Sequence, residues 1–322
     1  MSQFMRVAGF VAIVLLTVGS AWAVGYDFPR GEISLVELPF EANSQLNPQV
    51  TFDDYGDAHV VWEEERGASA FHMFGRSVGS SGELSPSYRC YQGTELDPHM
   101  YPYVFKKDLN SNQLFGFTVN TASPTYQLES VRYDLSVLPA PPSMTDLSTS
   151  TFGASGLEDF DMVAGMDHCY YVYKTNGNDG LFFGQFDQVT GLWTAGPSLL
   201  VAPANYKFRN PKLAVDEAGY LYVVFDKEFY GGTPSYSVET CRTVNASDLT
   251  SGWLGERYVV GSIEDHMYPV IAVRGSQGGG NLSVAIAYIE YQPAVSKQIK
   301  CTYEYMGDWV SVWSGDFSPA LN

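Results

Sequence analysis

Basic residues are scarce in this sequence: 18 lysines and arginines stand against 36 aspartates and glutamates, and the formal net charge is −18 at pH 7. With so few cations the chain has no basic stripe to neutralise a phosphate backbone, so we expect no nucleic-acid partner. A surface this acidic suits a solvated extracellular protein.

Long apolar runs are also missing after the first residues, because no later stretch approaches the roughly 20 apolar residues of a membrane-spanning helix. The run 7–18 is too short to span a membrane, follows Arg6, and precedes Ala21-Trp22-Ala23, which fits the small-residue rule for signal peptidase. We therefore predict a signal peptide over residues 1–23. The mature chain is predicted to be secreted or periplasmic, with no membrane span.

Cysteine is rare, and its spacing matches no Cys-x-x-Cys metal pattern. In an oxidising compartment an even number of cysteines allows one or two disulfides, with free buried thiols as the alternative. The four residues concerned are Cys90, Cys169, Cys241 and Cys301.

Sustained helical periodicity is absent as well, whereas aromatic residues make up 15% of the chain and glycine occurs 31 times. This balance predicts an all-β protein of strands and turns.

One unit of Pro, alternating strand, Asp/Gly turn and second strand recurs along the chain. Residues 47–62 and 210–225 match almost position by position, a third copy runs from 268 to 288, and two degenerate copies begin at 101 and near 160. The copies start 51–58 residues apart, which fits a four-stranded propeller blade. We predict one domain over 24–322, a β-propeller of five blades.

The chain ends predict how the ring closes. Residues 33–38 precede the first unit as 257–260 precede the last, so the N-terminal segment is predicted to complete the last blade as its outer strand. Six blades are the alternative, if the irregular stretch 139–156 hides a degenerate unit.

The pattern Pro-x-Val-x-x-Asp-x-x-Gly-x-x-x-Val-Val-Trp at 48–62, repeated at 211–225 with Phe225 in the Trp place, resembles secreted bacterial propellers of the sialidase-like and BNR-repeat superfamily. Residues 76–86 keep the outline of that family's Asp box without its Asp and Trp. No arginine cluster for a sialic acid carboxylate is evident. The resemblance thus implies the fold without the sialidase catalytic signature.

Five-bladed glycosidases that act on arabinan or fructan are enzymatic neighbours of this family, and they use axial carboxylates as acid and base. Asp53, Asp54 and Asp216 lie in Asp-x-x-Gly turns, where turn geometry explains them. We assign no catalytic residue. A sialidase-like or arabinanase-like glycoside hydrolase is the alternative function, with acids such as Asp97, Asp159, Asp161 or Asp265.

The string His-Met-Tyr-Pro occurs twice, at 99–102 and 266–269, where two units begin. In propellers the start of the innermost strand lies beside the central channel, so these residues are candidate ligand contacts. Aromatic rings stack on sugars, and carboxylates and amides bond hydroxyls. Equivalent residues of a repeat can also be alike because they pack alike. The candidates are His99, Tyr101, Asp159, Asp161, Asn210, His266 and Tyr268.

The leading hypothesis is a non-catalytic binding or scaffold propeller whose partner is a glycan or an extracellular protein. No cofactor is required, although carboxylates at these positions leave calcium open. The acidic run 63–65 is interpreted as a solvated rim at the end of a strand.

Overall fold

The computed structural model describes residues 45–66, 70–90, 99–106, 113–121, 126–135, 142–151, 156–194, 198–254, 257–260, 265–291, 297–305 and 316–317. The chain divides into two units, Met1–Leu35 and Val36–Asn322, and every described residue belongs to the second. The predicted signal peptide and the predicted closing strand 33–38 lie outside the described residues.

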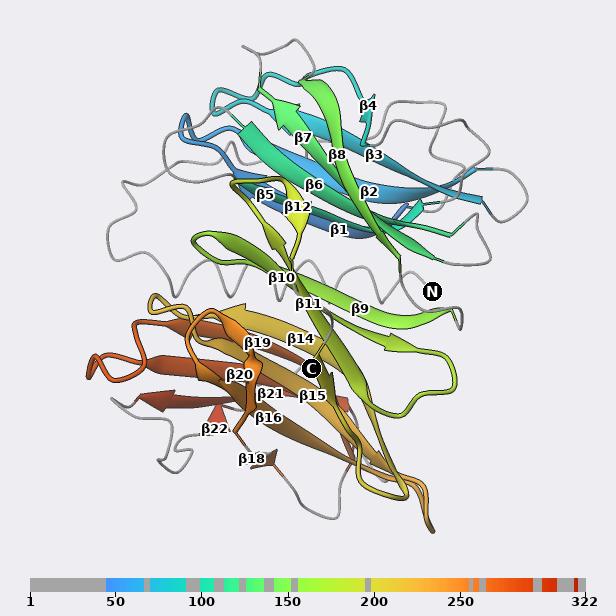
Figure 1. Cartoon of the computed structure of the whole chain (residues 1–322), viewed down its shortest axis with the longest axis vertical. Coiled ribbons are helices and arrows are strands. Elements are labelled where there is room, and N and C mark those ends of the chain that lie inside the picture. Colours follow the sequence, from blue (N-terminus) through green and yellow to red (C-terminus); the bar gives the residue numbers. More distant parts are fainter. Residues whose placement is uncertain are drawn as a thin grey trace. The chain divides into compact units, whose positions relative to one another are not determined.

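Five antiparallel sheets form the five blades of a β-propeller, coloured from blue for the first to red for the last in Figure 1. Blade 1 holds β1 (Gln45–Phe52), β2 (Ala58–Arg66), β3 (Ala70–Val78) and β4 (Tyr88–Arg89). Blade 2 holds β5 (His99–Lys106), β6 (Gln113–Asn120), β7 (Gln127–Asp134) and β8 (Ser143–Thr151). Blade 3 holds β9 (Leu157–Ala164), β10 (His168–Thr175), β11 (Leu181–Asp187), β12 (Leu192–Trp193) and β13 (Ser198–Leu200).

Blades 4 and 5 follow the same order. Blade 4 holds β14 (Tyr206–Val215), β15 (Leu221–Phe229), β16 (Ser235–Asn245), β17 (Asp248–Trp253) and β18 (Arg257–Val260). Blade 5 holds β19 (Asp265–Arg274), β20 (Ser283–Tyr291), β21 (Lys297–Tyr305) and β22 (Asp316–Phe317). The predicted all-β fold with five blades is confirmed. The described residues of the stretch 139–156 include β8, which pairs with β7 as the fourth strand of blade 2, so they belong to blade 2 and form no sixth unit.

The core lies between neighbouring blades. The clusters join blades 1 and 2, 2 and 3, 3 and 4, and 4 and 5 in turn. At the second of these interfaces Phe117 of β6 meets Phe186 of β11 edge to face, with ring centroids 5.0 Å apart. Each blade therefore buries its apolar face against the next, as the alternating strands require.

Four of the five first strands carry the same bulge, at Asn47, Tyr101, Asn210 and Tyr268. Each bulged residue precedes a proline and has a left-handed backbone, with φ between 47° and 56°. Asparagine tolerates this conformation, whereas tyrosine is strained in it. In β9 the pairing with β10 runs without a shift through Asp159, Phe160 and Asp161. The repeated bulge thus sets equivalent residues of four blades in one backbone conformation.

Among the described residues there is no helix, and hence none that is long and apolar enough to cross a membrane.

Candidate functional site

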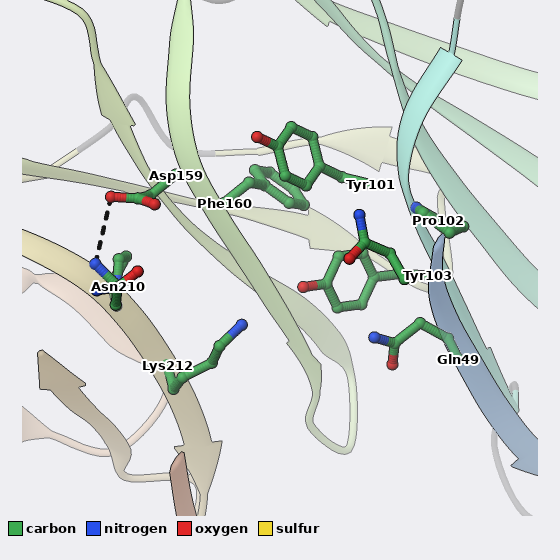
Figure 2. A pocket seen from close by; sticks show the side chains of 10 residues that line it. Gln49, Tyr101, Pro102, Tyr103, Asp159, Phe160, Asn210 and Lys212 are labelled. Carbon is green, nitrogen blue, oxygen red and sulfur yellow. Dashed lines mark hydrogen bonds between the residues drawn. The ribbon is translucent and has the colours of Figure 1, made fainter. Parts of the chain in front are cut away.

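The first strands of blades 1 to 4 line one pocket of about 180 Å³. Figure 2 shows Tyr101 and Tyr103 on one side of this pocket and Asn210 and Lys212 on the other. In blades 2 and 4 the left-handed residue, the proline and the residue after it all line the pocket, and in blade 1 the left-handed residue and the residue after the proline do so. The lining comprises Asn47 and Gln49 from β1, Tyr101, Pro102 and Tyr103 from β5, Asp159 and Phe160 from β9, and Asn210, Pro211 and Lys212 from β14.

Asp161 of blade 3 forms hydrogen bonds with residues of blades 2 and 4 beside this pocket. Its Oδ1 accepts hydrogen bonds from the Tyr103 hydroxyl at 2.8 Å and from Lys212 Nζ at 3.1 Å. Its Oδ2 accepts the backbone N–H of Leu213 at 2.7 Å. Both pocket-lining partners of Asp161 are therefore held in fixed positions.

Asp159 lies two residues earlier on β9 and lines the pocket itself. Its Oδ2 accepts the backbone N–H of Asn210 at 3.2 Å, the bond drawn in Figure 2. Burial raises the pKa of Asp159, and the charge of neighbouring Glu158 raises it further, against the lowering effect of the Asn210 bond and of nearby lysines. This carboxyl is thus more readily protonated than an exposed aspartate.

Tyr101 supplies the aromatic wall. Its ring packs on Phe160 with centroids 5.9 Å apart, and its backbone N–H donates to Glu63 Oε1 at 2.5 Å. Burial, together with the charges of Asp159 and Glu63, raises the pKa of Tyr101 to about 12. The phenol stays protonated at neutral pH and can donate a hydrogen bond to a ligand.

The two histidines of the repeated string are interior residues. His99 and His266 are each 1% exposed, and their Nε2 atoms lie 3.1 Å from Glu129 Oε2 and Glu290 Oε2 respectively. Neither lines the pocket. Tyr268 is 50% exposed and also lies outside the lining. Of the seven candidates, the structure thus brings Tyr101, Asp159 and Asn210 into the pocket lining, whereas Asp161 bonds the lining residues Tyr103 and Lys212 without lining the pocket itself.

Sequence reasoning missed Gln49, Tyr103 and Lys212 in the lining, and it misread Glu63. The sequence interpretation assigns Glu63 and Glu64 to a solvated rim, but they are 1% and 2% exposed. This interpretation is wrong because blade 2 packs over the end of β2: the bulge of β5 bonds directly to Glu63.

A Ser–His–Asp constellation occurs in blade 1, where His59 joins Ser77 Oγ at 2.9 Å and Asp53 Oδ2 at 3.0 Å. Ser77 is 1% exposed, so no substrate reaches it. The equivalent residues of blade 4 make the same kind of contact, because the Tyr222 hydroxyl donates to Asp216. This constellation braces a turn, as the sequence predicts for Asp53 and Asp216.

All four cysteines are free thiols, in line with the alternative to disulfides. In the part of the chain that the structure describes, no group of three or more His, Cys, Asp or Glu side chains could hold a metal ion. The pocket lining combines aromatic, amide, carboxyl and ammonium groups with two prolines.

No protein-family model matches the sequence, and no curated protein matches it either. Solved structures resemble it in fold. An α-L-arabinanase from Penicillium chrysogenum complexed with arabinobiose aligns with a TM-score of 0.53 at 12% identity, over 78% of this chain and 78% of its own. A family PL25 ulvan lyase bound to a GlcA–Rha3S saccharide aligns with a TM-score of 0.52 at 12% identity, over 84% of this chain and 69% of its own. At this identity the likeness shows the β-propeller fold.

Proposed function

We propose that this protein binds a glycan, and that the pocket lined by blades 1 to 4 holds one of its sugar rings. The observation that carries the proposal is the convergence of the Tyr101 ring with polar groups from four blades. Sugars present C–H faces that stack on aromatic rings and hydroxyls that bond amides and carboxyls. The polar groups are those of Asn47, Gln49, Asp159, Asn210 and Lys212.

The size of the pocket limits what enters it. At about 180 Å³ it is smaller than the roughly 300–1,000 Å³ of sites that enclose drug-sized ligands. We infer that a terminal or single sugar ring occupies it while the rest of the glycan lies over the surface. The predicted signal peptide supports a secreted or periplasmic location, where polysaccharides are encountered.

The two solved structures support a glycan over a protein partner, since one is an arabinanase with arabinobiose and the other a lyase with a saccharide. This support is an analogy of fold, because one fold hosts many activities. The remaining support for a glycan comes from the residues that line the pocket.

Hydrolysis is the second candidate function, and Asp159 favours it. Asp159 lines the pocket, and Asp161, two residues further along β9, bonds the lining residues Tyr103 and Lys212. Glycosidases use two carboxyl groups roughly 5–9.5 Å apart, one as general acid and the other as base or nucleophile. The raised pKa of Asp159 suits the general acid, and Asp161, held by Tyr103 and Lys212, suits the carboxylate partner.

The test combines a glycan array with a hydrolysis assay on arabinobiose and arabinan, each with and without calcium. We expect glycan binding by the purified protein that Tyr101→Asn weakens. If Asp159→Asn keeps binding but abolishes sugar release, the protein is a glycoside hydrolase. Binding without sugar release in the wild type makes it a non-catalytic binding propeller. Absence of binding to every glycan overturns the proposal and favours a protein-facing scaffold.

A further inference from the structure

Behind the pocket, Asp226 of β15 connects two blades through one oxygen. Its Oδ2 accepts the side-chain Nδ2 of Asn210 at 2.5 Å and the backbone N–H of Tyr268, on blade 5, at 3.2 Å. The residue is 0% exposed, and its Oδ1 is buried without a hydrogen-bond partner. A single carboxyl thus orients a pocket-lining amide and the left-handed tyrosine of the next blade.

The same arrangement recurs in blade 1. Glu63, on β2, accepts the backbone N–H of Tyr101 in the next blade, and the side chain of Asn47 counteracts the rise in the pKa of Glu63 that burial causes. Glu63 is 1% exposed, and its Oε2 is likewise buried without a hydrogen-bond partner. Two acids at equivalent positions therefore accept the backbone N–H of the left-handed tyrosine in the next blade, and both interact with the left-handed asparagine of their own blade.

The propeller fold does not require an acid at this position. On the second strand of their blades, Glu63 and Asp226 each pair with the residue just before the left-handed asparagine. In blades 2 and 5, where the left-handed residue is tyrosine, that position holds Val119 and Ile289. An acid thus occupies this position in blades 1 and 4, where the left-handed residue is an asparagine. Both asparagines line the pocket. This association points to a role in the site and not in blade packing alone.

We propose that Glu63 and Asp226 are positioning residues that orient the pocket-lining Asn47, Tyr101 and Asn210 for the ligand, and that Asp226 makes the orientation of Asn210 depend on pH. The proposal rests on the proposed function, since it concerns the same pocket.

The charge state of Asp226 decides how firmly Asn210 is held. Burial raises the pKa of Asp226 to about 7; the bonds from Asn210 and Tyr268 and the charge of Arg209 oppose this, and the charge of Asp159 adds to it. Once ionised, the carboxylate makes charge-assisted hydrogen bonds, which are about twice as strong as neutral ones. We therefore expect the ligand to bind more tightly as the pH rises through about 7.

The first experiment needs no ligand. In wild-type protein with ¹⁵N-labelled asparagine and tyrosine, the side-chain amide of Asn210 and the backbone amide of Tyr268 are followed by NMR between about pH 5 and pH 9. Both resonances are expected to shift together with one midpoint near pH 7. Asp226→Asn abolishes this transition, whereas the matched control Asp216→Asn, a buried acid in a turn of the same blade, preserves it.

The second experiment measures arabinobiose affinity, or that of the best glycan from the array, across the same pH range. Wild type is expected to bind about three- to tenfold more tightly at the alkaline end, the equivalent of one hydrogen bond. Asp226→Asn loses this pH dependence. If the two amide resonances do not shift with pH, or shift in the same way in Asp226→Asn, the inference is overturned whatever the ligand. If both amide resonances shift with pH but no glycan binds, the proposed function is overturned. The coupling between blades 4 and 5 through Asp226 would then still stand.

Discussion

Tyr103 of blade 2 donates a hydrogen bond of 2.8 Å from its hydroxyl to Asp161 Oδ1 of blade 3. Tyr103→Phe removes this donor from a buried carboxyl, which keeps Lys212 and the backbone N–H of Leu213 as partners. We expect the free energy of unfolding to fall by about 1–2 kcal/mol, measured by urea unfolding. Tyr55→Phe, at a tyrosine that is 67% exposed, is the control and should change it by less than about 0.5 kcal/mol. Equal changes in the free energy of unfolding for the two substitutions would contradict a stabilising role of the hydrogen bonds to Asp161.

The two tyrosines of the repeated string are predicted to differ in ligand binding. Asparagine keeps the left-handed backbone of either position at little cost, so Tyr101→Asn and Tyr268→Asn remove the ring alone. Because Tyr101 lines the pocket and Tyr268 does not, we expect glycan affinity to fall at least about tenfold in the first variant and to change little in the second. Calorimetry with the best glycan from the array checks this. Equal losses would place the binding site elsewhere.

Gly184 on β11 is predicted to tolerate no side chain. A Cβ atom there would lie 2.2 Å from the Tyr171 hydroxyl oxygen, so the tyrosine ring must leave its position between blades 2 and 3. We expect Gly184→Ala to destabilise the protein by about 1–3 kcal/mol, seen as a lower Tm. Gly232→Ala is the control, because its nearest neighbour, the Phe229 ring, stays 3.4 Å away. An unchanged Tm for Gly184→Ala would show that Tyr171 can repack.

Stability is predicted to fall with rising pH on account of Asp226. Its folded-state pKa of about 7 is above that of an unfolded aspartate, so between about pH 4 and pH 7 the folded protein binds more protons than the unfolded chain. The free energy of unfolding contributed by Asp226 therefore decreases through this range and levels off above it, by a few kcal/mol at most. Urea unfolding at several pH values compares wild type with Asp226→Asn. A difference between the two that is independent of pH would contradict the prediction.

The cysteines are predicted to be unreactive in the folded protein. Burial raises the pKa of Cys90 and Cys169 well above that of a free thiol, and it raises the pKa of the half-buried Cys301 as well. We expect the Tm to be the same with and without a reducing agent, and four thiols to react with a thiol reagent after denaturation. In the native protein Cys301 should react first. A Tm lowered by reductant would indicate a disulfide.

The repeat predicted the fold because its two clearest copies already contain a whole hairpin each. The Pro-strand-turn-strand pattern of 48–62 and 211–225 appears in the structure as β1–β2 and β14–β15. The predicted single domain over 24–322 and its closing N-terminal strand stay predictions, since the decisive residues lie outside the described part of the chain.

The site was harder to predict because a bulge decides which side chains reach the pocket. His99 and Tyr101 are two residues apart and would share a face in a regular strand, but the shift between Met100 and Tyr103 separates them. Burial of Glu63 depends on the neighbouring blade, which no local pattern reveals. Equivalent acids after Trp62 and Phe225 were nevertheless visible in the two clear copies, and comparing those copies would have found Glu63 and Asp226.

The four left-handed positions have a consequence for how such a ring changes its recognition over evolution. Each left-handed position forms a two-residue set with the nearby position on the second strand. When the left-handed residue is asparagine, that position holds an acid; when it is tyrosine, the position holds a β-branched apolar residue. Replacing one member of an asparagine–acid set alone leaves either a buried acid without its amide or an amide without its acceptor, and both are costly. Specificity in this ring is therefore expected to diversify by paired exchanges, one blade at a time. The sets are Asn47 with Glu63, Tyr101 with Val119, Asn210 with Asp226, and Tyr268 with Ile289.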